Sequence, residues 1–328
     1  MTSRQTQVDI LGFGHAIVDI LVERDETFLQ RHGLAKGSMT LVDEHRAERL
    51  FEEIAAGSLR RSGGSAANTI AGVASLGGRG GFVGKVGGDD LGHHFRRDIE
   101  SLGVVFAEHA PDSVPTGKCV VLVTSDAQRT MATFLGAGAK LAPSDVPAPL
   151  VAGAKVVYLE GYLWDPPSGR EACRQAAKLA HEAGNKVALT LSDPFCVERH
   201  RQAFREFLKH GVDILFANEV EIMSLFETDD FDAAVAAARD LGKLCALTRS
   251  SQGSVVVSGH EIHTVAAKPA RVVDTTGAGD LYAAGFLYGL TQGRDLKACG
   301  EIGSLCAAEI IGHFGARPEV ELAGLLAR

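Results

Sequence analysis

A repeated alternation of short apolar segments with helical segments constrains the fold of this chain more than any other feature. Apolar stretches at residues 155–159, 186–191, 213–217 and 245–248 are predicted strands, and predicted helices at 169–183, 199–210, 220–226 and 231–241 lie between or beside them. Strands that alternate with helices form parallel sheets covered on both sides. The sequence therefore predicts an α/β fold with a mostly parallel sheet flanked by helices on both faces.

The N-terminal half adds elements to this sheet and a second, looser part. A buried strand is predicted at residues 8–14, helices at 66–76 and 90–102, and a further strand beginning at 81. Residues 15–45 and 105–135 are strand-rich without clear helical spacing, and we expect them to pair as a small β-sheet lid over the site. The α/β core is then expected to comprise residues 8–14, 46–104 and 136–328.

Charge and cysteine spacing limit the possible partners. The chain has 328 residues and a net charge of -8, and its Lys and Arg residues do not cluster, which argues against nucleic acid. The N-terminus is polar and no apolar run approaches the roughly 18 residues of a membrane helix, so we expect a cytoplasmic protein without a membrane partner. The six scattered cysteines indicate reduced thiols.

One motif carries a chemical prediction. Residues 274–280 read DTTGAGD and directly precede a helical apolar face at 281–288. The free amides at the start of a helix bind anions, and small residues at Gly277, Ala278 and Gly279 allow a phosphoryl group to approach the backbone. Asp280 is then placed to take a proton from an acceptor hydroxyl as general base. The alternative is an ordinary loop in which Asp280 only caps the helix.

Three other classes of protein compete with this interpretation. A dinucleotide-binding dehydrogenase fails because the motif that starts at Gly12 and Gly14 has Ile17 at its third glycine position. A Walker-type kinase fails because the sequence contains no G-x-x-x-x-G-K-[ST] string. A silent nucleoside-binding regulator on the same fold would not need Asp280 and its intact glycine turn.

The sequence resembles the ribokinase and adenosine kinase family of carbohydrate and nucleoside kinases over about residues 8–318. Both signatures of that family are similar here: SGGSAANT at 62–69 with GKVGGDDLG at 84–92, and DTTGAGD at 274–280. The segments PTGKC (115–119), LSDPF (191–195) and DILFANE (213–219) are closer to the adenosine kinase branch. The resemblance implies a ribokinase-like fold, ATP and Mg²⁺, and leaves a monovalent cation possible.

The resemblance also implies roles for individual residues. Asp280 is the base beside the anion hole, and Arg129 lies near the transferred phosphate or, alternatively, faces solvent. The acceptor is held by His15, Asp19, Gly63, Gly64 and Asn68, although Asp19 alone also fits a turn or cap. Asn218 and Glu221 hold the water shell of Mg²⁺, with a capping box as the coexisting alternative. ATP is expected to contact Asn218, Thr248, Ser250 and Gly253.

These assignments predict transfer of the γ-phosphoryl of ATP to the 5′-hydroxymethyl group of a nucleoside, adenosine becoming AMP in purine salvage. His15 stands where similar adenosine kinases carry Asn, so a sugar kinase of the ribose or fructose type and a guanosine or inosine kinase stay open as alternatives. Phe134, Tyr162 and Trp164 are candidates for a base pocket or for the core. The partner is a small nucleoside or sugar, and the chain is a monomer or a homodimer.

Overall fold

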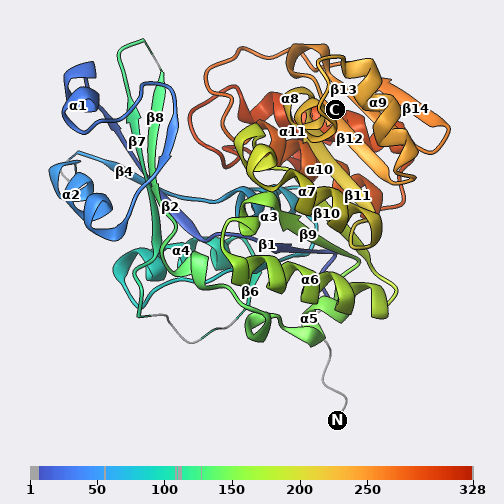
Figure 1. Cartoon of the computed structure of the whole chain (residues 1–328), viewed down its shortest axis with the longest axis horizontal. Helices are drawn as coiled ribbons and strands as arrows, with labels where there is room; N and C mark the ends of the chain where they lie inside the picture. Colours follow the sequence, from blue (N-terminus) through green and yellow to red (C-terminus); the bar gives the residue numbers. More distant parts are fainter. Residues whose placement is uncertain (1–6, 55–56, 108, 110–112, 127, 327–328) are drawn as a thin grey trace.

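A nine-stranded sheet forms the centre of the molecule (Figure 1). The computed structural model describes all residues except 1–6, 55–56, 108, 110–112, 127 and 327–328. The strand order is β14-β13-β12-β11-β10-β9-β1-β5-β6, and all pairs are parallel except β12 with β13 and β13 with β14. The strands are β1 (Ile10–Phe13), β5 (Gly80–Val83), β6 (Val105–Phe106), β9 (Val156–Glu160), β10 (Lys186–Thr190), β11 (Ile214–Asn218), β12 (Leu244–Thr248), β13 (Ser254–Ser258) and β14 (Glu261–Val265).

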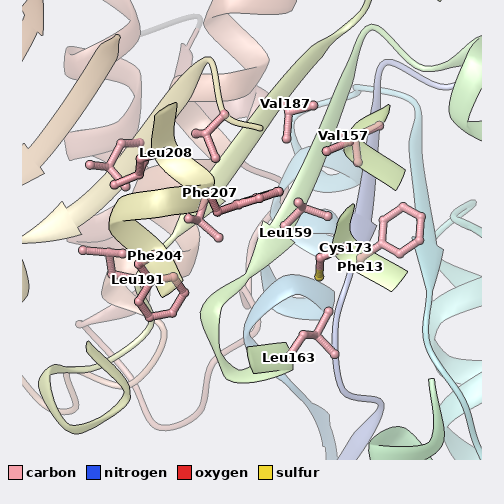
Figure 2. Close-up of a cluster of buried hydrophobic side chains, with 14 of the residues drawn as sticks. Phe13, Val157, Leu159, Leu163, Cys173, Val187, Leu191, Phe204, Phe207 and Leu208 are labelled. Atoms are coloured by element: carbon pink, nitrogen blue, oxygen red, sulfur yellow. The ribbon is translucent and has the colours of Figure 1, made fainter. Parts of the chain in front are cut away.

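Helices cover both faces of this sheet, as the alternation predicts. Alternate residues of each strand point to opposite faces: in β9, Val157 and Leu159 join one core cluster, and Val156 and Tyr158 join the other. Figure 2 shows part of the first cluster, where Phe204 and Phe207 of one helix pack toward the sheet. The core on this face includes residues of α5 (Ala148–Gly153), α6 (Pro167–Glu182), α7 (Pro194–His210), α8 (Glu219–Phe226) and α9 (Phe231–Asp240). The core on the opposite face includes residues of α3 (Ser65–Ser75), α4 (Asp90–Ser101), α10 (Ala278–Thr291) and α11 (Leu296–Ile310).

A second sheet of five strands lies beside this body (Figure 1). Its order is β3-β8-β7-β2-β4, with strands β2 (Ile17–Glu23), β3 (Met39–Leu41), β4 (Leu59–Gly63), β7 (Gly117–Val123) and β8 (Arg129–Phe134). Helices α1 (Glu26–Arg31) and α2 (Glu44–Ile54) pack on one face through a separate apolar cluster. In β2, Ile20 belongs to that cluster, whereas Asp19 and Leu21 line a cavity on the other face.

The sheets divide the chain differently from the expected segments at two places. Strand β4 and most of helix α2 lie within the segment 46–104 assigned to the core, but β4 pairs with β2 of the small sheet, and Leu50 and Ile54 of α2 join its apolar cluster. Strand β6, expected in the lid, pairs instead with β5 of the large sheet. The reason is physical: β4 reads LRRSG and has no apolar alternation, so its edge pairing leaves no pattern in the sequence.

Two further findings concern composition. None of the helices within the described part of the chain is long and apolar enough to cross a membrane. All six cysteines are buried free thiols, in agreement with the reduced state expected from their spacing.

Candidate active site

The glycine turn opens helix α10, as the sequence predicts. Gly277 is the N-cap residue and has a φ of 78°, a left-handed conformation that glycine adopts without strain. A Cβ on Gly279 would meet no atom within 4 Å, so the backbone there is open to an approaching group. The amide of Ala278 already donates to the carbonyl of Thr275 at 3.2 Å. The amides of Gly277 and Gly279 are therefore better placed to bind an anion than that of Ala278.

Asp280 lies in the first turn of α10 and is held by two side chains of helix α3. Ser65 Oγ donates to Oδ1 at 2.7 Å, and Asn68 Nδ2 donates to Oδ2 at 3.0 Å. Burial raises the pKa of Asp280 to about 6, against the lowering effect of these two hydrogen bonds; Glu160 raises this pKa further and Arg317 lowers it. The result is a fixed carboxylate with a pKa near neutral, which suits a general base.

Asp19 lines a cavity between the small sheet and the turn that opens α10. Burial raises the pKa of Asp19 to about 7, with Arg317 and Arg129 acting in the opposite direction. A Cβ on Gly63 would lie 2.4 Å from Asp19 Oδ2, so only glycine leaves room for this carboxylate. Gly64 has a φ of 91°, and its Cβ would lie 2.2 Å from a backbone carbonyl oxygen, that of residue 15.

The cavity that Asp19 lines is nearly closed. Its volume is about 40 Å³, whereas pockets for small organic ligands begin at roughly 300 Å³. Its other polar lining residues include Arg129 and Thr276 from the two sides of the cavity and Arg317 from the C-terminal segment. An acceptor the size of a nucleoside therefore does not fit this cavity unless its walls move apart.

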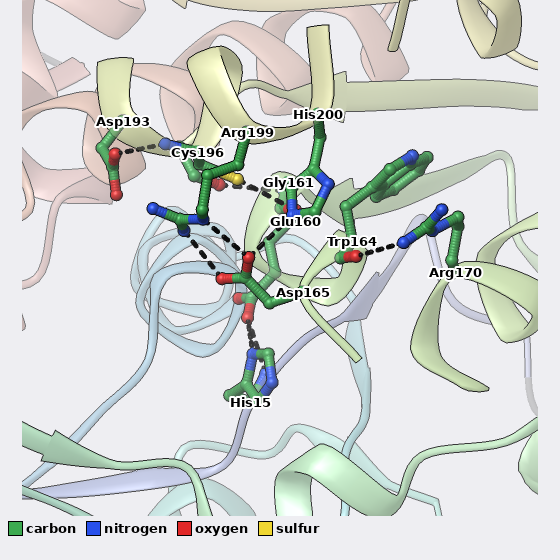
Figure 3. Close-up of polar contacts among 11 residues, drawn as sticks. His15, Glu160, Gly161, Trp164, Asp165, Arg170, Asp193, Cys196, Arg199 and His200 are labelled. Atoms are coloured by element: carbon green, nitrogen blue, oxygen red, sulfur yellow. Dashed lines mark hydrogen bonds and ion pairs between the residues drawn. The ribbon is translucent and has the colours of Figure 1, made fainter. Parts of the chain in front are cut away.

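His15 is held by a buried carboxylate that no sequence motif marks. Glu160, at the end of β9, accepts hydrogen bonds from His15, from its backbone amide at 2.8 Å and from Nδ1 at 2.7 Å (Figure 3). It also accepts one from the amide of Ala66 at 2.9 Å. Because a carboxylate oxygen accepts, Nδ1 carries the hydrogen of this bond, which leaves Nε2 of the ring for another partner. This Nε2 is buried without a partner among the described residues.

The three aromatic candidates for a base pocket differ in how deeply they are buried. Trp164 is fully buried and packs against Phe204 and Phe207 with ring centroids 5.0 and 5.1 Å away. It is therefore a core residue, and the pocket interpretation of Trp164 is wrong. Phe134 and Tyr162 are only partly buried, so their assignment stays a prediction.

Arg129 projects from β8 of the small sheet onto the turn before α10. Its Nη1 donates to Thr276 Oγ1 at 2.6 Å, and its Nη2 lies 2.5 Å from Asp274 Oδ2. The buried Asp274 also accepts from the amide of Thr276 at 3.0 Å and from the amide of Gly315 at 2.9 Å. A solvent-facing Arg129 is therefore excluded, because the side chain joins the small sheet to the glycine turn.

Asn218 and Glu221 form the capping box of helix α8. The amide of Glu221 donates to Asn218 Oδ1 at 2.8 Å, and the amide of Asn218 donates to Glu221 Oε2 at 2.9 Å. Burial raises the pKa of Glu221 to about 7, and the nearby Asp193 and Asp280 raise it too. Negative charge therefore reaches Glu221 from two other acids, which fits a cation that keeps its water shell. Within the described ranges, no three His, Cys, Asp or Glu side chains are arranged to bind a metal directly.

The residues expected to contact ATP follow strand β12. Thr248 is its last residue, and Ser250, with a φ of 50°, begins the turn that ends at Gly253. Gly253 has a φ of 84°, and a Cβ there would lie 2.0 Å from a backbone carbonyl oxygen, that of Val265. This glycine is therefore required by the turn itself, and its contact with a nucleotide stays a prediction.

Three residues that touch this site are missing from the predicted set. Ser65 stands inside the first signature without a predicted role, and Glu160 is an acid directly after a predicted buried strand, a position where α/β proteins bind ligands. Arg317 donates through Nε to Asn68 Oδ1 at 3.1 Å. Nothing in the sequence around Arg317 marks it, because its contact lies 249 positions away.

Known proteins are similar to this chain over nearly its whole length. A model of the pfkB family of carbohydrate kinases matches residues 54–322. The solved structure of adenosine kinase from Sinorhizobium meliloti is 49% identical with a TM-score of 0.92, covering 98% of this chain and 99% of that one. A "probable sugar kinase" from Rhizobium etli CFN 42 is 45% identical with a TM-score of 0.92, covering 98% of each. Adenosine kinase of Saccharomyces cerevisiae is 29% identical over 329 residues, covering 93% of this chain and 95% of that protein.

The fold, the site and these similarities define a class. A glycine turn that opens a helix beside a held carboxylate, on a ribokinase-like α/β sheet, belongs to a phosphotransferase with an alcohol group as acceptor. The chain is a member of the pfkB family of carbohydrate kinases. Its resemblance to the adenosine kinase branch is confirmed by the similarity to adenosine kinases.

Proposed function

We propose that this kinase transfers the γ-phosphoryl group of ATP to the 5′-hydroxyl of adenosine and releases AMP. The observation that carries the proposal is the pairing of two carboxylates: Asp280, fixed by Ser65 and Asn68, and Asp19, close enough for the charge of Asp280 to raise its pKa. The similarity to the adenosine kinase of Sinorhizobium meliloti supports the choice of acceptor.

Each carboxylate has a separate task in this proposal. Asp19 accepts hydrogen bonds from the two ribose hydroxyls, since a carboxylate can accept from both members of a cis-diol. Asp280 orients the 5′-hydroxyl and removes its proton as the new bond to phosphorus forms. Burial raises the pKa of both groups, to about 7 for Asp19 and to about 6 for Asp280, so each carboxyl can change its protonation state near neutral pH.

The remaining residues stabilise the transferred group and its counter-ion. The amides of Gly277 and Gly279 and the guanidinium of Arg129 are the donors nearest the turn, and they complement the negative charge of a phosphoryl group. Mg²⁺, held through water by Asn218 and Glu221, would neutralise charge on the phosphates of ATP. Thr248, Ser250 and Gly253 are the proposed contacts of the nucleotide.

A second acceptor class has its own support. The "probable sugar kinase" of Rhizobium etli is 45% identical to this chain, and His15 replaces the Asn of similar adenosine kinases. With Nδ1 bound to Glu160, His15 has Nε2 for the substrate, and hydroxyl groups of a sugar as well as polar groups of a purine can hydrogen-bond to it. Ribose, fructose, guanosine and inosine are thus the acceptors to compare.

The test is a phosphorylation screen in which products are separated and identified. Purified enzyme is given ATP, Mg²⁺ and, one at a time, adenosine, guanosine, inosine, ribose, fructose or fructose phosphate. We expect the highest kcat/KM with adenosine, with AMP and ADP formed in equal amounts. A higher kcat/KM with ribose or a sugar phosphate refutes adenosine as the acceptor but not the phosphotransferase class.

A further inference from the structure

Arg317 occupies a place in the site that no signature of the sequence indicates. It follows helix α11 in the C-terminal segment, and its guanidinium reaches helix α3, where Nε donates to Asn68 Oδ1 at 3.1 Å. Its Nη1 lies 3.4 Å from Asp98 Oδ2 on helix α4. Its Nη2 is buried without a partner among the described residues, and Arg317 lines the same cavity as Asp19.

The Asn68 amide stands between Arg317 and Asp280. Its Nδ2 donates to Asp280 Oδ2 at 3.0 Å, while its Oδ1 accepts from Arg317. A carboxylate can only accept and a guanidinium can only donate, so both neighbours require the same orientation of the amide. Without Arg317, one of those two constraints is lost and the amide is free to rotate its donor away from Asp280.

The charge of Arg317 faces the acids of the site. Asp98, Asp19 and Asp280 each favour its charged form, while burial lowers its pKa. Two charged groups act on Asp280: Glu160 from β9 raises its pKa, and Arg317 lowers it. The uncharged Ser65 and Asn68 of α3 also favour the ionised carboxylate, because they donate hydrogen bonds to it. Beside the buried Glu160, this positive charge adds to the hydrogen bonds from Ser65 and Asn68 in favouring the ionised form of Asp280.

We propose that Arg317 is a positioning residue for Asp280: it fixes the Asn68 amide that donates to this carboxylate and places a positive charge at the site of the two acids. The proposal rests on the assignment of Asp280 as the base, but it does not depend on which alcohol is the acceptor. It also gives Asn68 a role toward the base in addition to the acceptor contact predicted for it.

The experiment compares Arg317→Met, Arg317→Lys and a control, Arg96→Met, on a half-exposed arginine of α4 whose ion pair is with Glu100. Activity is measured with the best acceptor from the screen, over a pH range. Loss of a hydrogen bond that involves a charged group predicts a roughly ten- to hundredfold fall in kcat for Arg317→Met. The acidic limb of kcat/KM should move up by about one pH unit. Arg317→Lys should restore the limb but only part of kcat, and Arg96→Met should change neither.

Two further measurements test the role of Arg317 separately from the choice of acceptor. Carboxyl carbon NMR of the free enzyme follows Asp280 directly, and its titration should move to higher pH in Arg317→Met whatever the acceptor is. In an Asn68→Ala background, Arg317→Met should lower kcat by less than the single change does, because the shared hydrogen bond is already gone. An unmoved NMR titration and pH limb in folded Arg317→Met refute the proposal. If Arg317→Met does not fold, the same limb and titration are measured on Arg317→Gln, which keeps a donor without the charge and should still show the shift.

Discussion

Replacement of Asp280 by asparagine tests the proposed base and the cost of burying it in one experiment. The introduced amide keeps the size of the side chain and fits one orientation: its oxygen toward the Asn68 donor and its nitrogen toward Ser65 Oγ, which can also accept. The fold should therefore survive. The variant cannot take the hydroxyl proton, and loss of general-base catalysis predicts a fall in kcat of ~10²–10⁴-fold, or about 3–5 kcal/mol in activation free energy.

The same substitution should stabilise the folded protein. Burial raises the pKa of Asp280 from 3.8 to about 6, so the ionised carboxylate destabilises the fold by about 3 kcal/mol. Below pH 3.8 the carboxyl is protonated in both the folded and the unfolded chain, so it costs no stability. The cost grows as pH rises from 3.8 to about 6, and it is complete above about 6. At about pH 8, Asp280→Asn removes the cost and should raise Tm by up to about 4 °C for a chain of this length.

The assay measures kcat by ADP release, acceptor affinity by calorimetry and Tm by thermal unfolding on one preparation. Asp90→Asn is the matched control, because Asp90 is an acid in the first turn of helix α4 and lies outside the site. It should leave kcat unchanged. A fall in kcat of less than about tenfold in folded Asp280→Asn contradicts the base assignment, and a fall in Tm at the same alkaline pH contradicts the argument from burial.

Three further predictions concern the acid limb, the lid and His15. The kcat/KM of the native enzyme should fall about tenfold per pH unit below about 6 as Asp280 takes up a proton; a flat profile from about pH 7 to 5 contradicts this. Because the cavity is nearly closed without acceptor, the lid has to open for the acceptor and close over it again; amides of β2, β7 and β8 should become better protected from hydrogen exchange when bound acceptor holds the lid closed and water is excluded; equal exchange with and without acceptor argues against a moving lid. His15→Asn should raise the preference for adenosine over guanosine and inosine; an unchanged ratio in kcat/KM leaves His15 a structural partner of Glu160.

The sequence predicts the large sheet well because its strands and helices carry strong periodicity. The apolar stretch at 186–191 and the helical spacing at 90–102 correspond to β10 and α4. The lid is harder to delimit. Strand β4 contains two consecutive arginines and is held by pairing with β2 rather than by burial of alternate residues. Pairing between distant segments leaves no local pattern, so the sequence assigns β4 to the α/β core instead of the small sheet.

The residues of the site also divide into those that a local pattern predicts and those that only distant contacts bring together. Asp280 and its glycine turn are predictable because one short segment contains both the helix start and the acid. The partners of Asp280 are not, since Ser65 and Asn68 lie 215 and 212 positions earlier in the chain. Glu160 has a usable signal in its place at the end of a buried strand. Arg317 has none, because a single arginine in a loop is most often exposed.

The interior place of β1 in the large sheet has a consequence for biosynthesis. This strand pairs with β5 on one side and with β9 on the other, and β9 begins about 140 residues after β1 ends. At about 5–20 residues per second, the ribosome needs roughly 7–30 s to make that stretch. Throughout this interval one edge of β1 has no partner, and an unpaired apolar edge is a template for aggregation. The yield of folded enzyme should therefore depend on translation speed before residue 156 more than after it.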